Sequence, residues 1–321
     1  MENKKGLKKE CGFEFYSEQM VKKVTTKYYI EMSLFNGKIY NGYKYIVLSA
    51  SRMVDMPKFY QKEIIEEVKS RIEKGIKIHT LVLWTKHPGA LLENPLHNFL
   101  LYLKQQHVQL YIQLTITGLG GVKVGFKCNG KPLILEPNIP NYQDSLGSLL
   151  QIINLVGNPR RIRLRVDPII RLIDNQSKLF SSLKYFQEIV EVASELGIKD
   201  FSFSFLEKGV HQKVDRRFKK TGCEILSPNR KERQQTEVWF KKIAKKFNIN
   251  IFACCVPGFP VSKCINGELL QTLHDKNLPT DLRQPKRRDL CGCTNSIDIG
   301  GWPPKKCNSG CEYCYANAFY F

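Results

Sequence analysis

The sequence predicts an α/β fold, a partial (β/α)6 barrel of the TIM type whose cysteine-rich C-terminal tail folds over the barrel mouth. First, six short runs rich in β-branched and aromatic residues alternate with longer amphipathic runs, which indicates parallel strands joined by right-handed helical crossovers. Second, three of these strands have one apolar and one polar face, whereas a closed eight-stranded barrel fills its interior with bulky branched side chains. Third, eight of the 11 cysteines lie between Cys254 and Cys314, which marks a distinct C-terminal segment.

The expected elements divide the chain into residues 1–44, an N-terminal addition; 45–255, the partial barrel; and 256–321, the cysteine-rich segment. Strands are predicted where short apolar runs alternate with polar residues, at 45–50, 79–85, 109–117, 161–166, 200–206 and 250–254. Helices are predicted where the apolar spacing is helical, at 57–74, 95–106, 144–156, 176–196 and 231–247. Asp55 followed by Pro57 is a typical helix start, and Gly197 is a typical helix end.

The two faces of the middle strands differ in polarity. In 109–117, leucine and isoleucine alternate with polar residues such as Gln109 and Gln113; in 161–167 arginines alternate with apolar residues, and in 200–206 serines alternate with phenylalanines. We expect the apolar faces to lie under the helices. The polar faces then line a wide, open lumen that holds a polar ligand.

The charge suggests a polyanionic partner, with nucleic acid the first candidate, because the net charge of the 321-residue chain is +20. The alternative is that dispersed lysines serve solubility. Basic clusters occur at 213–220, 229–233, 241–246 and 283–288, of which the third has the spacing of a solvated helix face. No uncharged apolar run reaches 18 residues, so we expect no membrane span. An odd cysteine count without a secretory leader predicts a reducing, cytoplasmic location.

The cysteine spacing near the C-terminus predicts an iron–sulfur site. Cys307, Cys311 and Cys314 form a C-x3-C-x2-C motif, with Tyr313 directly before the third cysteine. Three thiolates would hold three irons of a 4Fe–4S cube and leave the fourth iron open to a small molecule. Zinc is the first alternative, although structural zinc usually takes four ligands, and unliganded thiols are the second.

Other polar groups follow the predicted strands at their carboxyl ends, where barrel enzymes have their active sites. The six candidates for binding a cofactor or ligand are Arg52, Asp55, Lys86, Thr117, Arg165 and Asp167. The three cations among them suit a carboxylate or phosphate. The alternative is that they form ion pairs with Asp55 and Asp167. The turn 118–121, Gly-Leu-Gly-Gly, is more typical of a turn than of a phosphate-binding loop.

Four further cysteines could form a second metal site. Cys254 (or Cys255), Cys264, Cys291 and Cys293 supply enough thiols for an auxiliary 4Fe–4S cluster or a zinc site, which would attach the tail to the rim of the barrel. The alternative is that these thiols are reduced and unliganded.

The C-x3-C-x2-C motif resembles that of radical S-adenosylmethionine (SAM) enzymes, although here it lies at the C-terminus. A longer set of segments between residues 46 and 317 resembles an uncharacterised bacterial family, a domain of unknown function with radical-SAM-like C-terminal cysteines. The matching segments are 49–57, 84–88, 117–120, 136–140, 165–169, 291–293, 298–300 and 307–317. This resemblance favours Cys254 over Cys255 at the end of the last strand.

The resemblance implies a radical SAM-type enzyme. Its open iron would hold SAM, an external donor would supply the electron, and the substrate, with nucleic acid among the candidates, is unknown. The competing hypothesis is a non-catalytic iron–sulfur or zinc protein that binds nucleic acid. No catalytic residue is identified from the sequence.

Overall fold

The computed structural model describes residues 34–35, 38–39, 45–285 and 289–318. Residues 45–321 form one unit, whose described part is compact and includes the cysteine-rich segment, and residues 1–44 are divided from it as a second unit. In the latter, the structure describes an antiparallel pair, β1 (Leu34–Phe35) and β2 (Lys38–Ile39). The rest of the expected N-terminal addition, 1–33, 36–37 and 40–44, lies outside the described residues.

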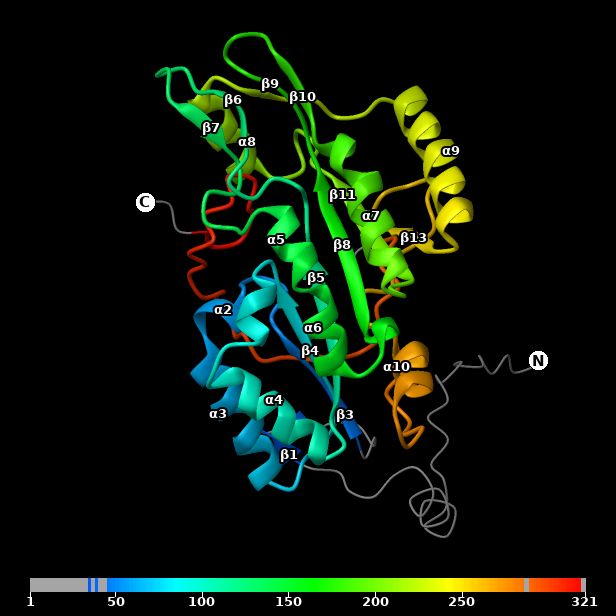
Figure 1. Cartoon of the computed structure of the whole chain (residues 1–321). Helices are drawn as coiled ribbons and strands as arrows, with labels where there is room; N and C mark the ends of the chain where they lie inside the picture. Colours follow the sequence, from blue (N-terminus) through cyan, green and yellow to red (C-terminus); the bar gives the residue numbers. More distant parts are fainter. Residues whose placement is uncertain (1–33, 36–37, 40–44, 286–288, 319–321) are drawn as a thin grey trace, which may run out of the picture. The chain divides into compact units, whose positions relative to one another are not determined.

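A seven-stranded parallel sheet forms the centre of the larger unit (Figure 1). The strand order is β13-β11-β8-β5-β4-β3-β14. The bounds are β3 (Tyr45–Ala50), β4 (Lys77–Thr85), β5 (Gln109–Thr115), β8 (Ile162–Ile169), β11 (Asp200–Phe205), β13 (Asn250–Ala253) and β14 (Ile297–Asp298). The first six strands are those predicted from the sequence, whereas β14, which pairs with β3, was not predicted. The sheet is open in the described part of the chain, with β13 and β14 at its edges and no closed barrel.

The helices pack on one face of the sheet, because the order of the first six strands follows the chain and right-handed crossovers then return on the same side. They are α2 (Met56–Phe59), α3 (Gln61–Glu73), α4 (Leu96–Gln105), α5 (Tyr142–Gly147), α6 (Leu149–Val156), α7 (Phe186–Glu195) and α9 (Arg230–Phe247). The main core joins this face to the helices: Leu110 and Ile112 of β5 belong to the same buried cluster as Leu100 of α4 and Ile152 of α6. None of the helices in the described ranges is long and apolar enough to span a bilayer.

The predicted helix 176–196 is wrong in its first part. Asp174 accepts hydrogen bonds from the backbone of Gln176 and Lys178, at 2.9 and 2.8 Å, and so closes a tight turn. This turn joins β9 (Arg171–Ile173) to β10 (Leu179–Ser181), and with β12 (Glu224–Ile225) they form a small antiparallel sheet. A 3₁₀ turn, η3 (Ser182–Tyr185), then leads into α7. The predicted helices 57–74 and 144–156 are each broken in two, at Tyr60 and Ser148.

The remaining elements lie around the sheet. They are η1 (Pro88–Leu91), η2 (Pro159–Arg161), the hairpin of β6 (Lys123–Phe126) and β7 (Pro132–Ile134), α8 (Gln212–Thr221) and α10 (Gly267–Leu273). The hairpin, the small sheet and α8 share a second buried cluster, and Cys311 and Tyr313 belong to it. The cysteine loop is therefore packed against a folded layer.

The polar face of the sheet is largely covered by the C-terminal segment, which corrects the expectation of an open lumen. Gln113 donates to the carbonyl of Cys264, and Gln109 donates to the carbonyl of Leu270 at 3.1 Å. His79 Nε2 lies 2.8 Å from the carbonyl of Leu278. Polar strand residues are suited to this face because the tail presents backbone groups that need partners once they are buried.

Candidate functional site

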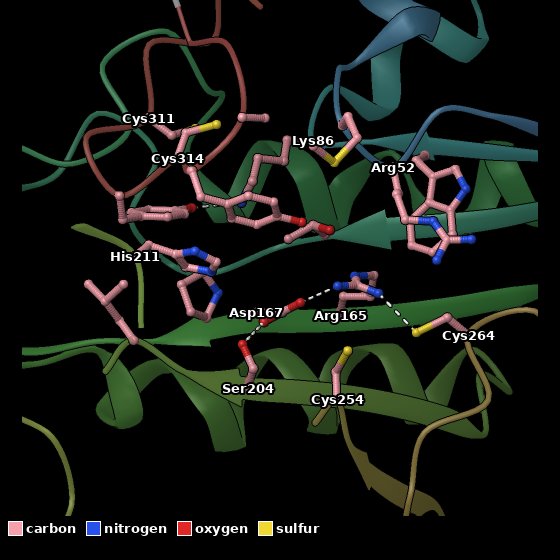
Figure 2. A pocket seen from close by; sticks show the side chains of 18 of the residues that line it. Arg52, Lys86, Arg165, Asp167, Ser204, His211, Cys254, Cys264, Cys311 and Cys314 are labelled. Atoms are coloured by element: carbon pink, nitrogen blue, oxygen red, sulfur yellow. Dashed lines mark hydrogen bonds and ion pairs between the residues drawn. The ribbon is translucent and has the colours of Figure 1, made fainter. Parts of the chain in front are cut away.

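A pocket of about 350 Å³ remains at the carboxyl ends of β3, β4, β8, β11 and β13 (Figure 2). This volume is within the range of small-molecule sites. Every cysteine and every rim residue predicted for the site lines the pocket except Thr117. The two cysteine groups, far apart in the sequence, thus face the same space.

Backbone and side-chain contacts hold the loop of Cys307, Cys311 and Cys314. The amide of Cys307 donates to the carbonyl of Asn317 at 2.8 Å, and the amide of Glu312 donates to the carbonyl of Leu135 at 2.9 Å. Cys307 and Cys311 are buried, and Cys314 is half-buried. The loop presents three thiols to the pocket with little freedom to rearrange.

Two members of the basic cluster 213–220 stabilise this same loop. Arg217 donates to the carbonyl of Glu312 and, at 3.1 Å, to that of Cys314. Lys213 Nζ donates to the carbonyl of Ala316 at 2.6 Å. These two cations bind the protein's own backbone, and the surface that they could offer to nucleic acid is correspondingly smaller.

Sequence reasoning missed Glu136, the centre of a buried polar network. Its side chain is about 1% exposed, and it accepts from Lys86 Nζ at 2.7 Å, from the hydroxyl of Thr117 at 2.6 Å and from the hydroxyl of Tyr313. Lys86 also donates to Tyr313 at 2.9 Å. Thr117 therefore lies outside the pocket and is linked to it by way of Glu136. The network as a whole attaches the cysteine loop to the sheet.

The turn 118–121 positions Glu136 and does not line the pocket. The backbone of Gly120 bridges to that of Glu136, and the amide of Gly121 donates to the carbonyl of Glu136 at 2.9 Å. A side chain at Gly120 would collide with the carbonyl of Pro140, so only glycine permits this approach. The sequence did contain a signal for Glu136, because segment 136–140 is among those that carry the family resemblance.

Lys86 is a charged group beside a buried thiol. Burial alone would lower the pKa of Lys86, but Glu136 and Cys311 outweigh it, so the pKa is raised. Burial raises the pKa of Cys311. Lys86 partly opposes this effect, since a nearby cation favours a thiolate.

Arg165 and Asp167 form an ion pair on the opposite wall, as the alternative interpretation of the rim predicted. Arg165 also donates to the sulfur of Cys264 at 3.2 Å, and Ser204 donates to Asp167 (Figure 2). Burial alone would lower the pKa of Arg165, but Asp167 and Cys264 raise it.

The four thiols of the predicted second site lie together. Cys264 and Cys293 are buried in one cluster, and Cys254 and Cys291 pack against it. Contacts from Cys254 and Cys293, followed by the charge of Arg165, lower the pKa of Cys264 well below its usual range. The same contact with Cys264, together with burial, raises the pKa of Cys254. Cys255 also borders the pocket, but it belongs to neither the cluster nor the residues packed on it.

The positions of these side chains bear on the metals expected from the sequence. Within the described ranges, no three His, Cys, Asp or Glu side chains converge on a position for a single metal ion. In an iron–sulfur cube each thiolate binds a different iron, so the ligands surround a volume and do not meet at one point. Three thiols of one short loop facing a common pocket fit that requirement.

Among the residues that the structure describes, no lysine or arginine forms an ion pair with Asp55. Its carboxyl accepts from the amide of Lys86 at 2.7 Å, from the hydroxyl of Thr85 at 3.0 Å and, as the N-cap of α2, from the amide of Lys58 at 3.3 Å. Burial outweighs these hydrogen bonds and raises the pKa of Asp55 from 3.8 to about 6.

We expect Asp55 to make the protein less stable as the pH rises from about 4 to about 6. The folded state holds the proton more tightly than the unfolded state, so the stabilisation present at low pH is lost as the pH passes the folded pKa. The free energy of unfolding should fall by roughly 3 kcal/mol at most across this window. Asp55→Asn should remove this contribution, as measured by denaturant unfolding at several pH values. If the free energy of unfolding depends on pH with the same slope in both proteins, the prediction is contradicted.

The fold and the site together define an α/β protein with an open parallel sheet and a cysteine-rich pocket at the carboxyl ends of its strands. Residues 47–316 match the family described as a domain of unknown function, DUF1848, and the chain belongs to this family. No curated protein matches the chain. The expectation of an uncharacterised family is thereby confirmed.

Proposed function

We propose that this protein is a radical SAM-type iron–sulfur enzyme of a reducing, cytoplasmic compartment, and that Cys307, Cys311 and Cys314 hold its cluster. The observation that carries the proposal is that these three thiols share one pocket with cationic groups from the strand ends. None of the ten described cysteines forms a disulfide, in agreement with a reducing compartment. We further regard the sheet as a partial TIM-like barrel, because the order of its first six strands follows the chain and its helices lie on one face.

A 4Fe–4S cluster with one open iron, when bound, would supply an electron from an external donor for the reductive cleavage of SAM into methionine and a 5′-deoxyadenosyl radical. The residues of this chain provide the surroundings. Lys86 favours the thiolate of Cys311, while its partner Glu136 opposes this effect, and Glu136 and Tyr313 fix Lys86 in place. Cys307 and Cys311 are largely buried, which shields their thiols from water except on the side that faces the pocket.

The test is an anaerobic electron paramagnetic resonance spectrum of the reduced, reconstituted protein with and without SAM. We expect a SAM-dependent shift of the cluster signal, and 5′-deoxyadenosine and methionine in the reaction mixture. An intact, reducible cluster that shows neither the shift nor the products would contradict the proposal.

A second candidate is a non-catalytic iron–sulfur or zinc protein that binds nucleic acid. The net charge of +20 favours it, as do Arg216, Lys219 and Lys220, which are exposed on α8. Such a protein would bind DNA or RNA with an affinity that falls as salt rises, and it would show no affinity for SAM.

A further inference from the structure

Three cations line the pocket, and the structure distinguishes them by their partners. Lys86 is paired with Glu136, and Arg165 is paired with Asp167. Arg52 forms no ion pair with any residue that the structure describes. It is the one pocket-lining arginine or lysine in that part of the chain whose charge is not matched by a carboxylate of the protein.

An indole fixes the position of Arg52. Its guanidinium carbon lies 5.5 Å from the centre of the Trp84 ring, and that of Arg165 lies 5.1 Å from the same ring. Trp84 donates from Nε1 to the hydroxyl of Ser49 at 2.9 Å, which orients the indole. Figure 2 shows the guanidinium groups of Arg52 and Arg165 at the same end of the pocket. Stacking on an aromatic ring restrains a guanidinium while its hydrogen-bond donors remain available.

The loop that carries Arg52 is held by the unpredicted strand β14. The amide of Ile299 donates to the carbonyl of Ser49 at 2.9 Å. Gly300 packs so closely on Ser51 that a side chain at Gly300 would collide with it. Ser51 itself has a left-handed backbone conformation, with φ of 45°, and accepts from the amide of Met53 at 3.2 Å. Arg52 is therefore presented to the pocket by a constrained backbone.

The acidic side chains that line the pocket already have hydrogen-bond or ion-pair partners within the protein. Asp167 is bound by Arg165 and Ser204, and Glu207 is bound by Arg233 at 2.6 Å. Asp55 accepts two backbone amides and the hydroxyl of Thr85. Arg52 is half-buried and faces this pocket, so its guanidinium donors are available to a carboxylate or phosphate that enters it.

We propose that Arg52, restrained on Trp84, binds a carboxylate or phosphate group of the small-molecule substrate, so that this substrate is an anion. Arg165, which lies over the same ring, adds positive potential to this end of the pocket, although its own charge is largely balanced by Asp167. Naming the ligand as the substrate rests on the proposed function. Anion binding at Arg52 does not, because it needs no cluster chemistry.

The experiment is isothermal titration calorimetry of the anaerobically isolated full chain with inorganic phosphate and, separately, with succinate, at constant ionic strength. We expect saturable binding of at least one probe, and the stronger of the two identifies phosphate or carboxylate as the preferred group. Arg52→Gln should weaken that binding at least tenfold, whereas Arg52→Lys should keep part of it, because lysine offers a point charge without the planar pair of donors.

The matched control is Arg160→Gln, since Arg160 is an exposed arginine outside the pocket. It should bind the probe as the natural protein does. Circular dichroism and visible absorption of each variant should match those of the natural protein, which separates loss of the site from loss of the fold. No saturable binding of either probe, or equal affinity in Arg52→Gln, would overturn the inference. Neither outcome changes the SAM-dependent spectrum that tests the proposed function.

Discussion

Replacement of Glu136 by alanine is expected to lower the free energy of unfolding by about 3–5 kcal/mol, because it leaves the largely buried side chain of Lys86 without its counter-charge. The carboxylate is almost completely buried, and it also accepts from Thr117 and Tyr313. Its loss removes the acceptor of the Tyr313 hydroxyl, one of two contacts that attach this side chain of the cysteine loop to the sheet; the other, from Lys86 at 2.9 Å, does not involve Glu136. Denaturant unfolding measures the stability, and limited proteolysis of the C-terminal segment measures whether the loop is released.

Glu224→Ala is the matched control. Glu224 also pairs with a lysine, Lys208, at 2.9 Å, but both side chains are more than half exposed. Exposed ion pairs contribute about 0–1 kcal/mol, so this variant should unfold almost as the natural protein does. If Glu136→Ala costs no more than Glu224→Ala, the buried network does not stabilise the loop and our interpretation of it is wrong.

Replacement of any one of Cys307, Cys311 or Cys314 by alanine should abolish the reducible visible chromophore of the proposed cluster, since two thiolates hold a cube poorly. Absorption and electron paramagnetic resonance spectra after anaerobic reconstitution measure the effect. Cys128→Ala serves as the control, because Cys128 is exposed and does not line the pocket. Purification from anaerobic cells with stoichiometric zinc and neither iron nor sulfide would refute the assignment.

Iron analysis of the same samples addresses the second group of thiols. About eight irons per chain would mean that Cys254, Cys264, Cys291 and Cys293 also hold a cube, and about four would mean that they do not. Removal of Cys264 is the most informative variant here, because its sulfur is contacted by Cys254, Cys293 and Arg165. A second cluster should be lost in this variant while the signal of the first is retained.

Sequence alone predicts the features that depend on local patterns. The six strands of the sheet follow from the alternation of short apolar runs with amphipathic ones, and the structure places all six as neighbours in chain order. The cysteine spacing and the polar residues at the strand ends can also be read from the sequence. Parallel strands bring their carboxyl ends to one edge whatever the details of packing, so these residues are expected to lie together. Except for Thr117, the predicted site residues accordingly line one pocket.

Tertiary structure decides the features that depend on which distant segments meet. No local pattern shows that Glu136 joins Lys86 to Tyr313, that β14 pairs with β3, or that the tail covers the polar face of the sheet. The same holds for two of the three cations of the rim. Lys86 acquires Glu136, 50 residues further along the chain, only through packing, and Arg52 is left facing the pocket without a carboxylate among the described residues. Arg165 differs, because its partner Asp167 lies two residues away on the same strand. The physical reason is that helix and strand periodicity is set within a few residues, whereas the partner of a buried charge is set by segments that can be more than a hundred residues away.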